Sequence, residues 1–225
     1  MANLTPMMQQ YLTLKEKYSD CLLFFRLGDF YEMFFDDAVL GSKEMELTLT
    51  GRDCGMSERA PMCGVPYHSV NTYINKLINK GYKVAICEQL QDPALAQGLV
   101  ERDVIRVITP GTVIEETMLD EKQNNYIAAV YARNFSYGLA YCDVSTGDFF
   151  VMNIETSNSA TDVFNELDRI CPRELIANPE FFENEQLAKQ VKNKFYTEQF
   201  EERYFELRTG LDKLLKHFQV ATLSG

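Results

Sequence analysis

The chain has 225 residues, enough for one large domain or two small ones, and its 46% hydrophobic content is sufficient to fill a core. Its net charge of −11 argues against a general polyanion-binding protein, because non-specific nucleic-acid binding depends on neutralising phosphates with Lys and Arg, but it leaves room for a local contact patch. No run of 18 apolar residues is present, so we expect neither a membrane-spanning helix nor a membrane partner. Six cysteines without a C-x-x-C pair predict reduced thiols, and a count of two histidines argues against a His-based metal centre.

The first half of the chain mixes predicted helices and strands. Thr5 and Pro6 predict a helix start, with a capping hydroxyl followed by proline at the first helical position. The apolar run 21–27 predicts a buried strand that ends at a Gly-Asp turn, after which residues 30–35 continue extended or turn sharply. Further predicted elements are a helix at 36–50, a Gly/Pro-punctuated loop at 51–66, a helix from 69 to Gly81, and strands at 82–90 and 104–109.

The second half begins with successive strands and then alternates helices and strands. Two β-rich segments, 124–132 and 136–154, precede a helix at 159–170 with a Ser or Thr cap. The remaining predicted elements are a hairpin turn at 147–148, a strand at 172–178, and helices at 181–193 and 210–219. The fold class is therefore α/β, and the polar stretch at 115–122 predicts two domains, 1–118 and 119–225.

An enzyme is the first functional class to test. The sequence contains no G-x-x-x-x-G-K-[ST], G-x-G-x-x-G, G-x-S-x-G or H-E-x-x-H motif. Asp143 lies in an apolar strand, as the first metal-binding aspartate of a ribonuclease-H-like nuclease does, but two-metal catalysis needs several convergent carboxylates. Later carboxylates do not lie in comparable apolar strands, so we interpret Asp143 as satisfied by the turn that follows it. A divergent nuclease remains the alternative, to be tested by magnesium-dependent cleavage.

The stretch "RLGDFYEMFFDDA" at 26–38 places aromatic side chains and an acid directly after the Gly-Asp turn. In an extended strand, Phe30 and Glu32 share one face and Tyr31 lies on the other. An apolar wedge can enter the minor groove and unstack a base step, most easily where stacking is already weak. A nearby acid can accept a hydrogen bond from a mispaired base while repelling ordinary phosphates. From spacing alone, packing of these aromatics in a core is the simpler interpretation.

Three ordered segments are similar to the MutS family of bacterial DNA mismatch-recognition proteins. They are "TPMMQQYLTLKEKYSDCLLFFRLGDFYEMFFDDA", "PMCGVPYHSVNTYINKLINKGYKVAICEQLQDP" and "VERDVIRVITPGT", and the first contains the Phe-x-Glu motif within "GDFYEMF". The similarity runs to about residue 118 and continues more loosely over the rest, which resembles the family's connector domain. The resemblance implies a mixed-sheet α+β first domain and a ribonuclease-H-like α/β connector without nuclease activity.

By position, the resemblance implies that Phe30 is a stacking wedge and that Glu32 contacts the mispaired base. It places four further residues near the DNA backbone, namely Arg52, His68, Lys76 and Arg102. Lys76 could equally belong to a solvated face and His68 to a helix start. The aromatic residues assigned to the core are Tyr31, Phe34 and Phe35.

The resemblance also implies partners and cofactors. Family members are far longer, and their C-terminal ATPase uses ATP and magnesium and drives homodimerisation. For this chain we expect no enzyme activity, no cofactor and no metal, weak binding to mismatched duplex DNA, and a cytoplasmic, nucleoid-associated location. The connector is expected to relay signals to the ATPase and to dock MutL. The alternative hypothesis is a protein-interaction module that has no autonomous DNA binding.

Overall fold

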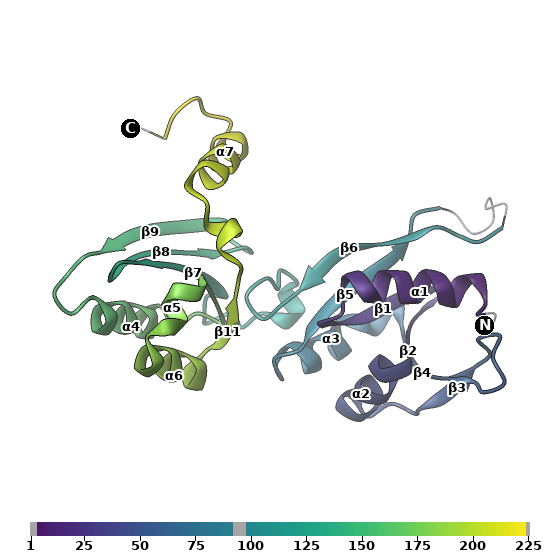
Figure 1. Ribbon diagram of the computed structural model, residues 1–225. Helices are drawn as coiled ribbons and strands as arrows, with labels where there is room; N and C mark the ends of the chain where they lie inside the picture. The colour runs from purple at the N-terminus through teal and green to yellow at the C-terminus, as the bar shows by residue number, and fades with distance from the viewer. Residues whose placement is uncertain (1–3, 92–97, 224–225) are drawn as a thin grey trace. The chain divides into compact units, whose positions relative to one another are not determined.

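A computed structural model describes residues 4–91 and 98–223 of the chain (Figure 1). The chain divides into two compact units, residues 1–120 and 121–225. Each unit contains one mixed β-sheet with helices, which confirms the predicted mixed α/β class. All six cysteines are free, as their spacing predicted. None of the helices in the described part of the chain has the length and apolar character needed to cross a membrane.

Unit 1 is built on a six-stranded sheet in the order β3-β4-β2-β1-β5-β6. Strand β1 runs parallel to β5, and all other neighbouring pairs are antiparallel. The elements are α1 (Pro6–Lys17), β1 (Cys21–Leu27), β2 (Phe30–Phe34), α2 (Phe35–Met45), β3 (Thr50–Arg52), β4 (Ala60–Pro66), η1 (Tyr67–Ser69), α3 (Val70–Ile78), β5 (Lys83–Gln89), β6 (Arg102–Ile108) and η2 (Glu116–Met118).

The two faces of this sheet carry separate hydrophobic cores. Helix α1 covers one face, where Tyr11 and Leu14 pack with Phe25 and Phe34. Helices α2 and α3 cover the other face, whose core contains Tyr31 together with apolar side chains of both helices. The alternation along β2 therefore matches the predicted one, with residues 30, 32 and 34 on the α1 face.

Three local predictions in unit 1 are wrong. The supposed loop at 51–66 contains strand β4, because pairing with β2 and β3 overrides its Gly/Pro composition. The helix predicted at 36–50 ends at Met45, because Glu46 adopts a left-handed conformation with φ 59°. Helix α1 begins at Pro6, but the Thr5 hydroxyl does not cap it and has no hydrogen-bond partner among the described residues, whereas the backbone N–H of Thr5 donates to the carbonyl of Cys54 at 2.9 Å.

Unit 2 contains a five-stranded sheet in the order β11-β10-β7-β8-β9. Strands β7, β8 and β9 form an antiparallel meander, whereas β10 runs parallel to both β7 and β11. The elements are β7 (Tyr126–Arg133), β8 (Ser136–Asp143), β9 (Asp148–Ile154), α4 (Ser159–Ile170), β10 (Glu174–Ala177), α5 (Pro179–Glu183), α6 (Glu185–Lys194), β11 (Tyr196–Gln199), η3 (Glu202–Phe205) and α7 (Leu207–Phe218).

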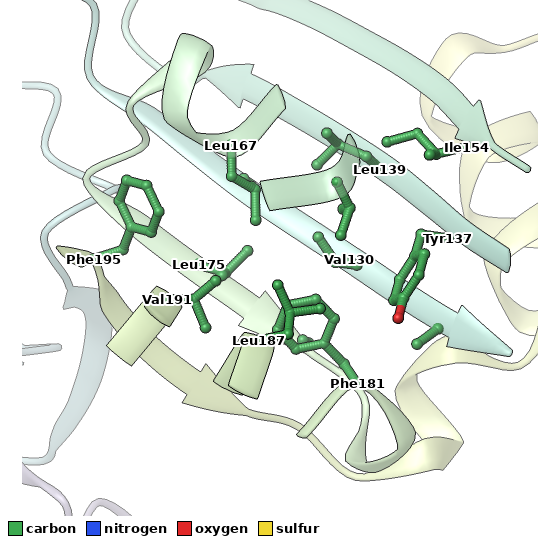
Figure 2. Close-up of a cluster of buried hydrophobic side chains, with 14 of the residues drawn as sticks. Val130, Tyr137, Leu139, Ile154, Leu167, Leu175, Phe181, Leu187, Val191 and Phe195 are labelled. Atoms are coloured by element: carbon green, nitrogen blue, oxygen red, sulfur yellow. The ribbon is translucent and has the colours of Figure 1, made fainter. Parts of the chain in front are cut away.

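The core of unit 2 lies between one face of its sheet and helices α4, α5 and α6 (Figure 2). Apolar side chains of the strands, such as Val130 and Leu175, meet Leu167, Phe181 and Val191 from the helices. The predicted helix at 181–193 is two helices instead, because the Asn184 side chain caps α6 by accepting from the backbone N–H of Leu187. The cap predicted for α4 is also wrong, since Asn158 precedes that helix without a side-chain cap.

Candidate functional site

The β1–β2 hairpin presents Phe30 at the start of a strand inside the sheet. Gly28 has φ 57°, a left-handed conformation that glycine adopts without a Cβ penalty, and this turn brings Leu27 opposite Phe30. The phenyl side chain is 47% exposed, whereas the other aromatic residues of β1 and β2 are buried. Those buried residues are Phe24, Phe25, Tyr31 and Phe34. The hairpin thus leaves a single aromatic ring of these two strands open to solvent.

Phe34 lies on the same face of β2 but is closed off by α1. Its ring makes an edge-to-face contact with Tyr11 at 5.0 Å between centroids, and the Tyr11 hydroxyl lies within hydrogen-bonding distance of both backbone groups of Phe34. Tyr11 also donates to buried Asp37, which forms an ion pair with Lys15 of α1 at 2.9 Å. Burial raises the pKa of Tyr11 well above its ordinary value, and the Asp37 charge adds to this effect. This network ties α1 to the far end of β2 and leaves the Phe30 end uncovered.

Glu32 lies between these two phenylalanines and forms an ion pair with Arg52. The distance from Arg52 Nη1 to Glu32 Oε2 is 2.5 Å, and the two side chains are 37% and 13% exposed. Glu32 pairs with Phe25 of β1 on one side and with Gly64 of β4 on the other. A Cβ atom on residue 64 would lie 3.3 Å from the Glu32 Cγ atom, so glycine there leaves room for the glutamate side chain.

Arg102 has a different environment from Arg52. It is 8% exposed and its guanidinium lies 5.1 Å from the centroid of the Phe25 ring. Its nitrogens donate to the Arg26 carbonyl at 2.8 Å, the Val100 carbonyl at 2.8 Å and the Gln10 side chain at 3.2 Å. Burial lowers the pKa of Arg102, and the nearby charge of Arg52 lowers it further. These contacts tie the start of β6 to β1 and to α1, so we leave Arg102 out of the candidate interface.

The two remaining predicted residues lie elsewhere in unit 1. His68 is exposed on η1, two residues after Pro66, the strand residue that pairs with Phe30. It therefore borders the open end of the hairpin. Lys76 is exposed on α3, the helix that packs on the opposite face of the sheet. The structure thus groups Phe30, Glu32 and Arg52 on one face, with His68 at its edge and Lys76 apart.

Sequence reasoning missed the residues that brace the hairpin. The Arg26 guanidinium lies 4.0 Å from the centroid of the Tyr67 ring, and the Tyr67 N–H donates to the Asp29 carbonyl at 2.9 Å. On the same side, Tyr31 donates to the Glu88 carboxylate, and burial followed by this hydrogen bond raises the pKa of Tyr31 to about 12. No local pattern indicates these contacts, because the partners lie far apart in the sequence. Together they fix the turn from which Phe30 projects.

Asp143 in unit 2 is satisfied by its own surroundings. It is 2% exposed, and its carboxylate accepts from the backbone N–H groups of Asn125 and Ser145 at 2.9 Å and from the Ser145 hydroxyl at 2.6 Å. Burial raises its pKa, but these hydrogen bonds outweigh burial and leave the pKa below its ordinary value. Within the described residues, no three His, Cys, Asp or Glu side chains are arranged to hold a metal ion. The interpretation of Asp143 as a turn-satisfied aspartate is confirmed.

Comparison with known proteins covers both units. The family model described as MutS domain I matches residues 5–117, and the one described as MutS domain II matches residues 125–225. The chain belongs to the MutS family. The DNA mismatch repair protein MutS of Acetivibrio thermocellus is 54% identical over 97% of this chain, and that of Ruminiclostridium cellulolyticum is 54% identical over 100%. The MutS of Halothermothrix orenii is 50% identical over 100% of the chain.

The matched region is a limited part of these relatives. The chain spans 25% of the Acetivibrio protein, 26% of the Ruminiclostridium protein and 25% of the Halothermothrix protein. Unit 1 therefore corresponds to MutS domain I and unit 2 to MutS domain II, the connector in the resemblance stated above. The face that carries Phe30 and Glu32 lies entirely within domain I.

Proposed function

We propose that unit 1 reads mispaired or unpaired bases in duplex DNA, with Phe30 as a stacking wedge and Glu32 as a hydrogen-bond acceptor. The observation that carries this proposal is the exposure of Phe30 beside Glu32 on one open face, whereas every other aromatic residue of β1 and β2 is buried. Membership of the MutS family supports it, because the relatives are named DNA mismatch repair proteins. The proposal concerns recognition and assigns no catalytic step to this chain.

The wedge acts through the cost of unstacking. Inserting an apolar ring between base pairs costs a few kcal/mol for each step that is unstacked, and this cost is smallest where a mispair has already weakened stacking. The ring then recovers part of the cost by stacking on a base, which is worth about 1–3 kcal/mol in alanine substitutions elsewhere. Phe30 is suited to this role because its exposed ring rests on a braced hairpin and contributes little to the core.

Glu32 adds discrimination. An ionised carboxylate accepts hydrogen bonds and donates none, so it favours a base that offers a free N–H group. Beside ordinary paired DNA, the same charge repels phosphates and gains no partner. Exposed Asp29 and Asp53, next to Phe30 and Arg52 in the chain, strengthen this repulsion. We therefore expect the chain to bind DNA weakly, with a preference for mismatched duplexes.

The test is fluorescence anisotropy at low salt, comparing a duplex that contains G·T or an unpaired T with its matched duplex. The expected result is a preference for the mismatched duplex that falls about tenfold or more in Phe30→Ala, since that stacking energy is lost. Phe135→Ala is the matched control, because it removes an 87% exposed phenylalanine in unit 2. A mismatch preference that is equal in the wild type and in Phe30→Ala would remove the wedge role.

Unit 2 supports a second candidate function, a docking surface for MutL. Helices α4, α5 and α6 cover one face of its sheet, whereas Phe149 and Val151 on the other face are 46% and 70% exposed. We expect the intact chain to retain MutL in a pull-down and Val151→Asp to retain less, because a charge on that face opposes apolar contact. Failure of the wild-type chain to recover MutL would count against this function and leave the DNA-reading role untouched.

We also propose that nucleotide chemistry lies outside this chain. In this view ATP and magnesium act in the full-length protein, which is a homodimer, while the present chain is not an enzyme and needs no cofactor. Unit 2 then relays the state of unit 1 to the ATPase. Equilibrium dialysis with ATP and magnesium tests this division, and saturable nucleotide binding by the present chain would contradict it.

A further inference from the structure

The two partners of the ion pair between Arg52 and Glu32 differ in their position in the sheet and in their exposure to solvent. Its carboxylate belongs to a strand inside the sheet, but its guanidinium comes from β3, a three-residue strand at the sheet edge. Among the described residues, Glu32 is the one ion-pair partner of Arg52. The arginine is also the more exposed partner, at 37% against 13%. The pair therefore joins a carboxylate that the sheet holds in place to a guanidinium whose side chain can rotate towards solvent.

The carboxylate itself has little freedom. Its strand is hydrogen-bonded on both sides, and the Glu32 side chain occupies the space that Gly64 leaves empty. Fully buried Phe25 flanks it on β1 and cannot supply a hydrogen bond. If Arg52 moves away, Glu32 keeps its place and loses its partner. A carboxylate that is largely shielded from water and unpaired is costly, so another donor must replace the guanidinium.

We propose that Arg52 is a specificity-determining residue that exchanges partners when DNA binds. In the free protein it neutralises Glu32, and in the complex it moves to a backbone phosphate and releases the carboxylate to the base. This inference rests on the proposed reading of DNA by Phe30 and Glu32. A guanidinium forms bidentate hydrogen bonds with phosphate as readily as with carboxylate, so the exchange preserves its own pairing.

The exchange is favourable on mispaired DNA and unfavourable on matched DNA. On a mispaired or unpaired base with a free N–H, both partners of the broken pair find new ones, since Arg52 gains a phosphate and Glu32 gains the base. On matched DNA the Watson–Crick edges are occupied, so Glu32 is left unpaired whenever Arg52 leaves it. Discrimination then arises from the penalty on the wrong ligand as much as from contacts with the correct one.

The experiment is a double-mutant cycle of Glu32→Gln, Arg52→Gln and the double variant, in which binding to the mismatched duplex is measured at several salt concentrations. NMR titration suits the weak affinity expected of this chain and also reports the Arg52 guanidinium N–H signals. Each phosphate contact adds about 0.9 to the slope of log affinity against log salt. Arg59→Gln is the matched control, because it removes an exposed arginine from the connection that joins β3, the strand of Arg52, to β4.

The proposal expects Arg52→Gln to reduce the salt slope by about 0.9 both in the wild-type background and in the Glu32→Gln background, because Arg52 contacts phosphate in either complex. It also expects Glu32→Gln to shift the NMR signals of the Arg52 guanidinium N–H groups in the free protein towards those of a solvated arginine. Arg52→Lys should restore the salt slope while restoring less of the mismatch preference, since lysine lacks the planar fork.

Two results would overturn the exchange while leaving the proposed function intact. A slope that Arg52→Gln lowers only in the Glu32→Gln background would show that Arg52 stays on Glu32 in the wild-type complex. A slope that Arg52→Gln changes no more than Arg59→Gln does would show that Arg52 makes no distinct phosphate contact. Absence of DNA binding by every variant would instead contradict the proposed function, and the exchange would fail with it.

Discussion

Two carboxylates, Glu32 in unit 1 and Asp143 in unit 2, occupy strands of mixed sheets and differ in what holds them. Asp143 is 2% exposed and accepts from two backbone N–H groups and a hydroxyl. Glu32 is held by the side chain of Arg52, which is 37% exposed. The backbone donors cannot leave Asp143 without moving the start of β7 or the β8–β9 turn, whereas an arginine side chain can leave Glu32 by rotation. Glu32 is thus held by a partly exposed side chain and Asp143 by fixed backbone groups, and this difference is what the proposed partner exchange requires.

The largest expected change in stability distinguishes the end of β2 that α1 covers, at Phe34, from the exposed end, at Phe30. Phe34→Ala should lower the free energy of unfolding by about 3–5 kcal/mol, because it empties a fully buried site beneath α1. Phe30→Ala should lower it by less than about 1 kcal/mol, because its ring is 47% exposed. Urea denaturation of both variants measures this difference. Similar losses in the two would mean that Phe30 is a core residue and would break the contrast.

The next largest change in stability is expected at the buried carboxylate of Asp143. Asp143→Ala should lower the free energy of unfolding by about 1–3 kcal/mol for each amide left without an acceptor. The amides affected are those of Asn125 and Ser145. Thermal denaturation followed by circular dichroism provides the measurement. A variant as stable as the wild type would show that these hydrogen bonds contribute nothing, and would reopen a functional role for Asp143.

The pH dependence of the free energy of unfolding tests the same hydrogen bonds of Asp143, and we expect a smaller change than for Asp143→Ala. The folded-state pKa of Asp143 is lowered, so its contribution to stability is complete above the unfolded value of about 3.9 and is lost as pH falls through the folded value. Asp143→Asn should therefore be less stable than the wild type from neutral pH down to about pH 5, and the gap should narrow below about pH 4. A gap that widens on acidification would contradict this sign.

The smallest change in stability is expected at the carboxylate of Glu32. Glu32→Gln should change the free energy of unfolding by less than about 1 kcal/mol, since its ion pair with a partly exposed arginine contributes little. Chemical denaturation in parallel with Asp143→Ala gives the comparison under one set of conditions. A loss at Glu32 as large as that at Asp143 would show that the pair serves the fold, and the case for partner exchange would weaken.

Local chemistry in the sequence predicted the main elements of this fold. The apolar runs of β1 and β5, the Gly-Asp turn and the alternation of β2 follow from residue type and spacing, and the structure places them as expected. Strand β4 escaped prediction because its Gly and Pro residues are tolerated only where β2 and β3 supply the pairing. Strand β11 escaped as well, because the short polar-containing segment Tyr196–Gln199 is extended only beside β10.

The same division holds for the candidate site. The period of a strand is two, so the sequence by itself determined that Phe30 and Glu32 share a face. Only the tertiary structure decided that α1 covers Phe34 and leaves Phe30 exposed, that Arg52 pairs with Glu32, and that Arg102 is buried. Those contacts join residues far apart in the chain, and a local pattern contains no information about which distant side chain fills a neighbouring space. The aromatic and the acid could thus be identified from the sequence, while the ion-pair partner of the acid, Arg52, became apparent only in the folded structure.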